Sequence, residues 1–172
     1  MKAAFIEQTG PPEVITHGDL LDPVAGPRQA LVRVRAYAVN PIDTHIRAGN
    51  LAVPLPVPFV VGCDLAGEVV AVGAGVDRLR PGMRVWGSNQ GLLGRQGTFA
   101  ELAAIDERWL YPTPDGVSDR DAAAATLVSI TAHVGLVGRA GVRPAEMVFV
   151  AVQEATTLRG TGALAGKIVV EP

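Results

Sequence analysis

The sequence predicts a mainly β fold with short helices, a barrel or sandwich built from about seven or eight short strands. Three observations support this fold class. The 20 glycines and 13 prolines favour many turns between short segments. Several segments alternate polar and apolar residues as half-buried strands do. A hydrophobic fraction of 48% with 19% charged residues is typical of a soluble globular domain with a core.

The first third of the chain predicts two strands and a capped helix. Residues 1–7 form an opening strand, and residues 30–36 alternate valine with arginine, the period of a half-buried strand. Asn40 is a helix cap residue, and Pro41 suits the first helical position of a helix over Pro41–Ala48. Gly49 can end this helix in a left-handed conformation.

The middle of the chain, residues 61–87, predicts the centre of the domain. The proline-rich residues 51–59 before it must be extended, because each proline removes a donor and restricts its neighbour. Residues 68–72 form a strand that ends at the turn 73–75. A further strand follows at 84–86, and after a glycine-rich loop another is expected at 98–104.

The last third predicts two helices and two strands. Ser118 and Asp121 have the spacing of a capping box at the start of a short helix. A second helix over residues 126–138 is apolar on most sides and is expected to be buried. Residues 146–150 and 167–171 are expected to be strands.

Charge and cysteine content exclude several classes of protein. A net charge of −2 provides no basic surface for nucleic acid and no polybasic membrane anchor. The amino terminus has no apolar run of signal-peptide length, and the uncharged residues 122–138 are too short and polar for a membrane span. We therefore expect a cytoplasmic protein. Cys63, as the single cysteine, forms no intrachain disulfide.

Neither a zinc site nor a nucleotide loop is expected from the motifs. The cysteine and the three histidines are too far apart in sequence for the usual zinc clusters. Cys63 is interpreted as a buried packing residue, the alternative being a nucleophile with a spatial neighbour. Residues 160–165 match G-x-G-x-x-A, but a polar segment precedes them and a strand follows, so we interpret them as a loop.

Asn40, Asp43 and His45 are the candidate catalytic residues. Asn40 and Asp43 are also fully explained as helix-capping residues, and both interpretations stay open. His45 could act as a proton donor, the alternative being a surface histidine without a role.

Five segments resemble the medium-chain dehydrogenase/reductase superfamily, in its zinc-independent quinone oxidoreductase branch. They are MKAAFIEQTGPPEV, VRVRAYAVNPIDTHIRAG, PFVVGCDLAGEVVAVGAGVDRLRPGMRVWG, GTFAELAAIDERWLYPTPDGVSDRDAAA and SITAHVGL, in the order and spacing of that family. The resemblance runs to about residue 150 and implies a GroES-like domain, a distorted β-barrel. Members with catalytic zinc carry a cysteine near Asn40 and a GHE motif where this chain has Gly62-Cys63-Asp64, so the resemblance also implies no zinc.

The resemblance implies reduction of small quinones or activated alkenes (enones) by hydride transfer from NADPH. Asn40 and Thr131 match positions near the nicotinamide end of the cofactor, and Asp43 helps to hold that corner. His45 stands where relatives often have tyrosine, and Leu51 lies near another position that is often aromatic. Because His45 and Leu51 lack the large aromatic ring of those relatives, a substrate ring would not stack on them in the same way.

The resemblance also predicts three regions. Residues 1–125 form the GroES-like catalytic domain, and residues 126–150 are a linking helix with the first strand of an otherwise missing Rossmann domain. Residues 151–172 are a carboxyl-terminal tail whose last strand returns to the catalytic domain. An engineered deletion, a natural deletion and an abridged sequence all fit this pattern. We expect little or no activity from the chain alone. The alternative is a stand-alone, non-catalytic module that binds a small molecule or partner, or associates with itself through the exposed cleft or a strand edge, at the helix 126–138 and the strand 146–150.

Overall fold

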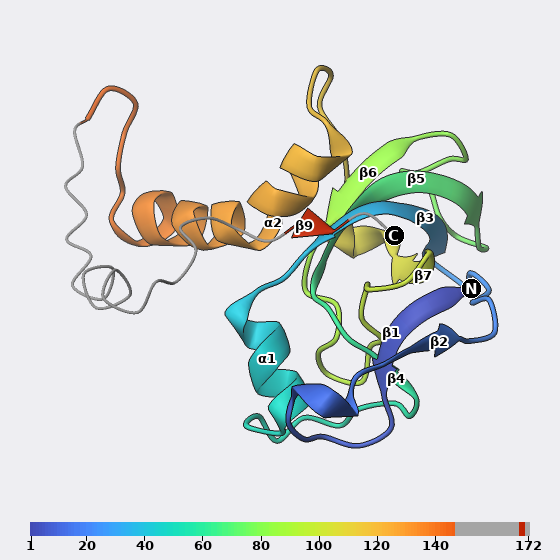
Figure 1. Cartoon of the computed structure of the whole chain (residues 1–172). Coiled ribbons are helices and arrows are strands. Elements are labelled where there is room, and N and C mark those ends of the chain that lie inside the picture. The colour runs from blue at the N-terminus through green and yellow to red at the C-terminus, as the bar shows by residue number, and fades with distance from the viewer. Residues whose placement is uncertain (147–168, 171–172) are drawn as a thin grey trace.

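The computed structural model describes residues 1–146 and 169–170 (Figure 1), so the strand predicted at 146–150 and most of the tail 151–172 lie outside the described part. Within it the elements are mostly strands, with two α-helices, two 3-10 turns and a π-helical segment. The strands are β1 (Lys2–Ile6), β2 (Thr16–Asp19), β3 (Gln29–Ala38), β4 (Phe59–Val60), β5 (Asp64–Val72), β6 (Arg84–Gly87), β7 (Leu102–Asp106), β8 (Leu110–Pro112) and β9 (Val169–Val170). The helical segments are η1 (Pro12–Val14), α1 (Pro41–Ala48), η2 (Glu107–Trp109), α2 (Asp119–His133) and η3 (Val134–Arg139).

The strands form two antiparallel sheets. The smaller has the order β2-β1-β4, and the larger has the order β7-β3-β5-β6-β8, with β9 paired to the end of β3 at Tyr37 and Ala38. An isolated antiparallel bridge pairs Ala3 of β1 with Ala100, just before β7. The mainly β prediction is therefore confirmed, and among the described strands the pairings do not close into a ring.

The main core lies on one face of the long strands β3 and β5. Alternate residues of β3, including Val32 and Val34, are buried against Leu65 and Val69 of β5. The alternation predicted from sequence is thus real, with the arginines of β3 on the other face. Burying each such side chain stabilises the fold by about 1.5–3 kcal/mol. Because the buried residues of β3 and β5 lie in the same cluster, these two strands form the centre of the fold.

Helix α1 has the predicted bounds and caps. The carboxylate of Asp43 accepts a hydrogen bond of 2.6 Å from the backbone N–H of Asn40, which satisfies a donor at the helix start. At the other end Gly49 has a φ of 78°, the left-handed conformation expected for a helix-ending glycine.

Helix α2 corrects the prediction of two helices with a buried second one. The capping box of Ser118 is confirmed, since its hydroxyl accepts from the backbone N–H of Asp121 at 3.1 Å. The helix then runs unbroken to His133 and continues as η3. Its buried residues all lie in the first half, at Ala122, Ala123 and Thr126.

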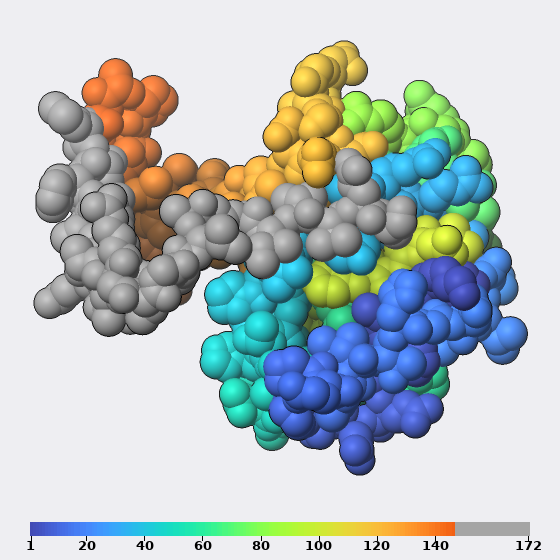
Figure 2. All heavy atoms as spheres, viewed as in Figure 1, coloured from blue at the N-terminus to red at the C-terminus, as the bar shows by residue number. Residues whose placement is uncertain are grey.

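The second half of α2 and η3 extend away from the sheets (Figures 1 and 2). Val128, Val134 and Val137 are 52%, 52% and 50% exposed. The sequence was misleading because an uncharged, apolar segment predicts burial, whereas only the small alanines of the first half reach the sheet. By length and composition alone Asp119–Arg139 could cross a membrane, but its first turns pack on β3, β5 and β6.

The strand predicted at 98–104 begins later than expected. β7 starts at Leu102, and residues 98–101 contribute only the bridge at Ala100. The reason is that Thr98 is turned into the interior, where its hydroxyl donates to the carbonyl oxygen of Asp64 at 2.8 Å.

Candidate functional site

A fully buried carboxylate, Asp64, lies at the centre of the candidate site. Asp64 is the first residue of β5 and is 0% exposed. Its Oδ1 accepts from the hydroxyl of Ser88 at 2.6 Å, and its Oδ2 accepts from Asn40 Nδ2 at 3.0 Å and from the backbone N–H of Leu127 at 3.2 Å. We call Asn40, Asp64, Ser88 and the Leu127 N–H the Asp64 cluster. It joins β3, β5, the loop after β6 and α2.

Burying a charge is unfavourable unless hydrogen bonds replace the water that it loses. Three donors around one carboxylate provide that replacement, so the Asp64 cluster anchors α2 to the sheet. The cluster therefore holds the middle of α2, at Leu127, against the start of β5.

Cys63 lies beside the cluster and is buried. Its Sγ is 3.6 Å from the Ser88 hydroxyl oxygen. Burial raises the pKa of the Cys63 thiol to about 11, which keeps it protonated at neutral pH. This environment agrees with the predicted packing role and gives the thiol little nucleophilic character.

Asn40 and Asp43 lie together at the junction of β3 and α1, as their capping roles require. Asn40 is 3% exposed, and its side-chain amide donates to Asp64 Oδ2 and, at 3.3 Å, to the carbonyl oxygen of Ala38. An amide group has two hydrogens, so these two bonds engage both of them. Asn40 therefore positions the chain at this corner, and Asp43 holds the start of α1.

His45 and Thr131 are exposed, in contrast to Asn40 and Asp43. The Nδ1 atom of His45 lies 3.3 Å from the side-chain amide nitrogen of Asn50. The hydroxyl of Thr131 donates to the carbonyl oxygen of Leu127 at 2.9 Å. Thr131 is thus connected through Leu127 to Asp64, whereas His45 lies outside the Asp64 cluster.

The roles of Asp64 and Ser88 were missed by sequence reasoning. The available signal was an aspartate inside the apolar run FVVGCDLAGEVV, since an acidic residue there must be paired when buried. Nothing local to the sequence indicates its partners, which come from positions 24 and 63 residues away.

Another buried carboxylate, Glu107 of η2, holds the loop between β5 and β6. It accepts from the backbone N–H groups of Arg78 and Asp77, both at 3.2 Å, and pairs with the Arg28 guanidinium at 2.9 Å. The hydrogen bond from Arg78 is the main cause that lowers the pKa of Glu107, followed by that from Asp77 and the charge of Arg28. These contacts of Glu107 connect separate loops and so stabilise the fold.

Metal ligands are not grouped in the described residues. Nowhere in residues 1–146 and 169–170 do three or more His, Cys, Asp or Glu side chains come close enough to hold a metal ion.

Comparison with known proteins identifies similar chains. Residues 26–115, just over half of the chain, match the family described as "Alcohol dehydrogenase GroES-like domain". A quinone oxidoreductase of Pongo abelii is 32% identical over 151 residues, which are 87% of this chain and 45% of the relative. The chain thus spans a little under half the length of such curated relatives.

Solved structures agree with this match. An alcohol dehydrogenase superfamily protein from Novosphingobium aromaticivorans superposes with a TM-score of 0.75 at 42% identity, covering 83% of this chain and 43% of that one. A quinone oxidoreductase of Escherichia coli complexed with NADPH gives a TM-score of 0.73 at 26% identity, covering 81% and 41%. The GroES-like fold class is confirmed by these similarities.

Proposed function

The chain belongs to the alcohol dehydrogenase GroES-like domain family, within the medium-chain dehydrogenase/reductase superfamily, and from this premise we propose that it is the substrate-side domain of an NADPH-dependent quinone oxidoreductase. The observation that supports this most is the Asp64 cluster, which joins three residues of the matched segment, Asn40, Asp64 and Ser88, to the backbone of α2 in the interior of the domain. The proposed substrates are small quinones or enones.

The described residues fit the nicotinamide end of NADPH in part. The Thr131 hydroxyl is exposed and uses its proton on Leu127, so its lone pairs can accept a hydrogen bond from a carboxamide. Asn40 is a positioning residue in this proposal, because its amide hydrogens are engaged by Ala38 and Asp64. NADPH, when bound, supplies the hydride.

The chain's own contribution is positioning, exclusion of water and proton supply. The Asp64 cluster holds α2 and the β3–α1 corner in a fixed relative position. Hydride transfer requires the cofactor and the substrate to be held in a fixed orientation. In this proposal His45, which is exposed on α1, passes a proton from solvent to the second quinone oxygen as hydride reaches the first. The quinone gains one hydride and one proton and leaves as hydroquinone. No zinc takes part in this proposal.

Reduced nicotinamide mononucleotide tests the nicotinamide end on the chain itself. We expect millimolar binding with amide NMR shifts at Thr131, and loss of those shifts in Thr131→Val, which keeps the shape of the side chain but lacks the hydroxyl. Ala132→Val, at the adjacent exposed position, is the matched control. Shifts that are absent, or unchanged in Thr131→Val, would contradict the placement.

NADPH itself tests the expectation that the 172-residue chain is inactive or weak alone. Calorimetry should show no micromolar binding, and reduction of 1,4-benzoquinone should be slow. Micromolar binding would overturn this expectation. The intact mass of the protein from its source, 17.9 kDa or about twice that, decides which molecule carries the activity.

The second candidate function is a non-catalytic module that associates with itself. The specific observation for it is the exposure of Val128, Val134 and Val137 along α2 and η3, in a stretch without Asp, Glu, Lys or Arg. A second copy offers the same exposed apolar residues, so pairing of the two helices would cover part of them.

A further inference from the structure

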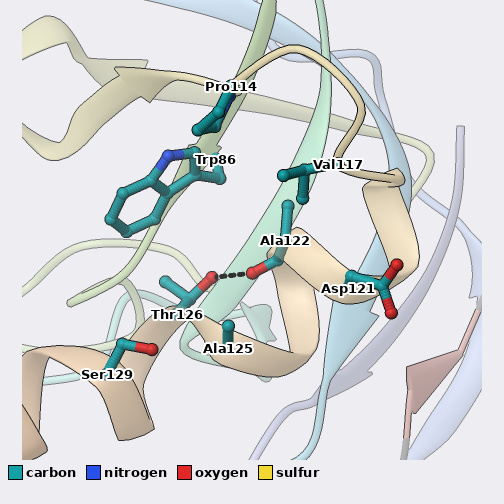
Figure 3. A pocket seen from close by; sticks show the side chains of 8 residues that line it. All are labelled: Trp86, Pro114, Val117, Asp121, Ala122, Ala125, Thr126 and Ser129. Carbon is teal, nitrogen blue, oxygen red and sulfur yellow. Dashed lines mark hydrogen bonds between the residues drawn. The ribbon is translucent and has the colours of Figure 1, made fainter.

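An apolar hollow lies between β6 and the first turns of α2, outside the Asp64 cluster. It has a volume of about 270 Å³. Residues that line it include Trp86, Pro114, Val117, Ala122, Ala125 and Ser129. We call it the Trp86 hollow. Figure 3 shows the indole of Trp86 on one side and the side chains of Val117 and Ala122 on the other.

The shape of the Trp86 hollow suits a flat ring. The indole provides an aromatic wall, and it is supported by Tyr111, whose ring centroid lies 5.1 Å away at 31°. Aromatic rings favour offset stacking on such a wall. A dry apolar cavity of about 150 Å³ holds one benzene molecule, so this larger volume has room for two fused rings.

The polar groups of the hollow limit the ligand further. The hydroxyl of Thr126 donates to the Ala122 carbonyl oxygen at 2.6 Å, so its proton is already used. Ser129 makes no side-chain hydrogen bond to any part of the chain that the structure describes, and its hydroxyl can donate. Asp121 at the edge places a negative charge there, which disfavours anions.

We propose that the Trp86 hollow binds a neutral, planar ligand of two fused aromatic rings, stacked on Trp86, with one carbonyl oxygen that accepts from Ser129. The site is separate from Thr131 and needs no nicotinamide cofactor. The result of testing this site is therefore independent of the proposed reductase function.

The experiment titrates the chain with 2-acetylnaphthalene and follows both tryptophan indole N–H signals by NMR. We expect a saturable shift of Trp86 with a dissociation constant on the order of 0.1 to 1 mM. Trp109, which lies outside the hollow, is the internal control. The saturated analogue 2-acetyldecalin has the same carbonyl but no flat ring, and should bind about tenfold more weakly.

Two variants locate the ligand. Ala125→Leu fills the hollow from an exposed helix position and should weaken binding about tenfold or more, whereas Ala132→Leu on the same helix should not change it. Ser129→Ala should weaken binding about threefold through the lost hydrogen bond. The proposal is wrong if the Trp86 signal does not move, if Ala125→Leu binds as the wild type does, or if the two analogues bind equally.

Discussion

At the scale of single residues, two buried carboxylates organise this domain, and they have different tasks. Asp64 joins strands and helix around the candidate site, and Glu107 holds the loop between β5 and β6. Both satisfy the rule that a buried charge needs several donors.

Asp64→Ala tests the Asp64 cluster. The change leaves the Ser88 hydroxyl, an Asn40 amide hydrogen and the Leu127 N–H without their acceptor. An unsatisfied buried donor costs about 1–3 kcal/mol, so we expect the free energy of unfolding to fall by about 3 kcal/mol or more. Urea denaturation measures it. Asp115→Ala, in an exposed turn, is the control, and an equal effect of the two changes would show that the cluster does not stabilise the domain.

The lowered pKa of Glu107 predicts that the free energy of unfolding depends on pH. Its pKa is lower in the folded chain than in the unfolded one, chiefly through the hydrogen bond from Arg78. Glu107 therefore makes its full contribution to the free energy of unfolding when the pH is above the pKa that it has in the unfolded chain. This contribution is lost as the pH falls from there to the pKa that it has in the folded chain. Glu107→Gln should be less stable than wild type at pH 7, and this difference should shrink on acidification. Denaturation curves at several pH values measure it, and a difference that is constant with pH would argue against this role.

At the scale of elements, β5 and α2 determine the arrangement. β5 pairs with β3 on one side and β6 on the other, and α2 packs its alanine-rich start over all three strands. The close approach of β3 to β5 depends on Gly67, because a Cβ atom there would overlap the carbonyl oxygen of Arg33.

Gly67→Ala should therefore force the two central strands apart. We expect a loss of about 3 kcal/mol or more in the free energy of unfolding, measured by thermal or urea denaturation. Gly135→Ala is the matched control, since a Cβ at that exposed helical position meets nothing within 4 Å. It should be neutral or slightly stabilising. Near-wild-type stability of Gly67→Ala would mean that β5 can shift without cost.

At the scale of the whole molecule, the exposed valines of α2 and η3 predict self-association. Sedimentation velocity should show a sedimentation coefficient that rises with concentration. Replacing both Val134 and Val137 with glutamate should give a monomer at all concentrations, because like charges would then face each other across the contact. A wild-type chain that stays monomeric at high concentration would contradict the prediction.

The cytoplasmic location and the regions 1–125, 126–150 and 151–172 stay predictions. The structure places α2 across position 125, so the first boundary falls inside a helix.

The sequence alone determined the features that rest on neighbours within a few residues. The caps of α1 at Asn40 and Gly49, the cap of α2 at Ser118, and the alternation of β3 all depend on bonds or faces within a turn or a strand. The order and spacing of the motifs also identified the family, because they reflect ancestry and need no coordinates.

Only the tertiary structure decided what those elements bring together. Asn40, Asp64, Ser88 and Leu127 meet across segments far apart in the chain, so the apolar run around Asp64 indicates at most that this acid is buried and does not indicate its partners. The same is true of the exposed half of α2: apolar composition predicts burial, but whether a side chain is covered depends on which other element reaches it. Local hydrogen bonds fix the elements, and contacts between distant residues fix the site.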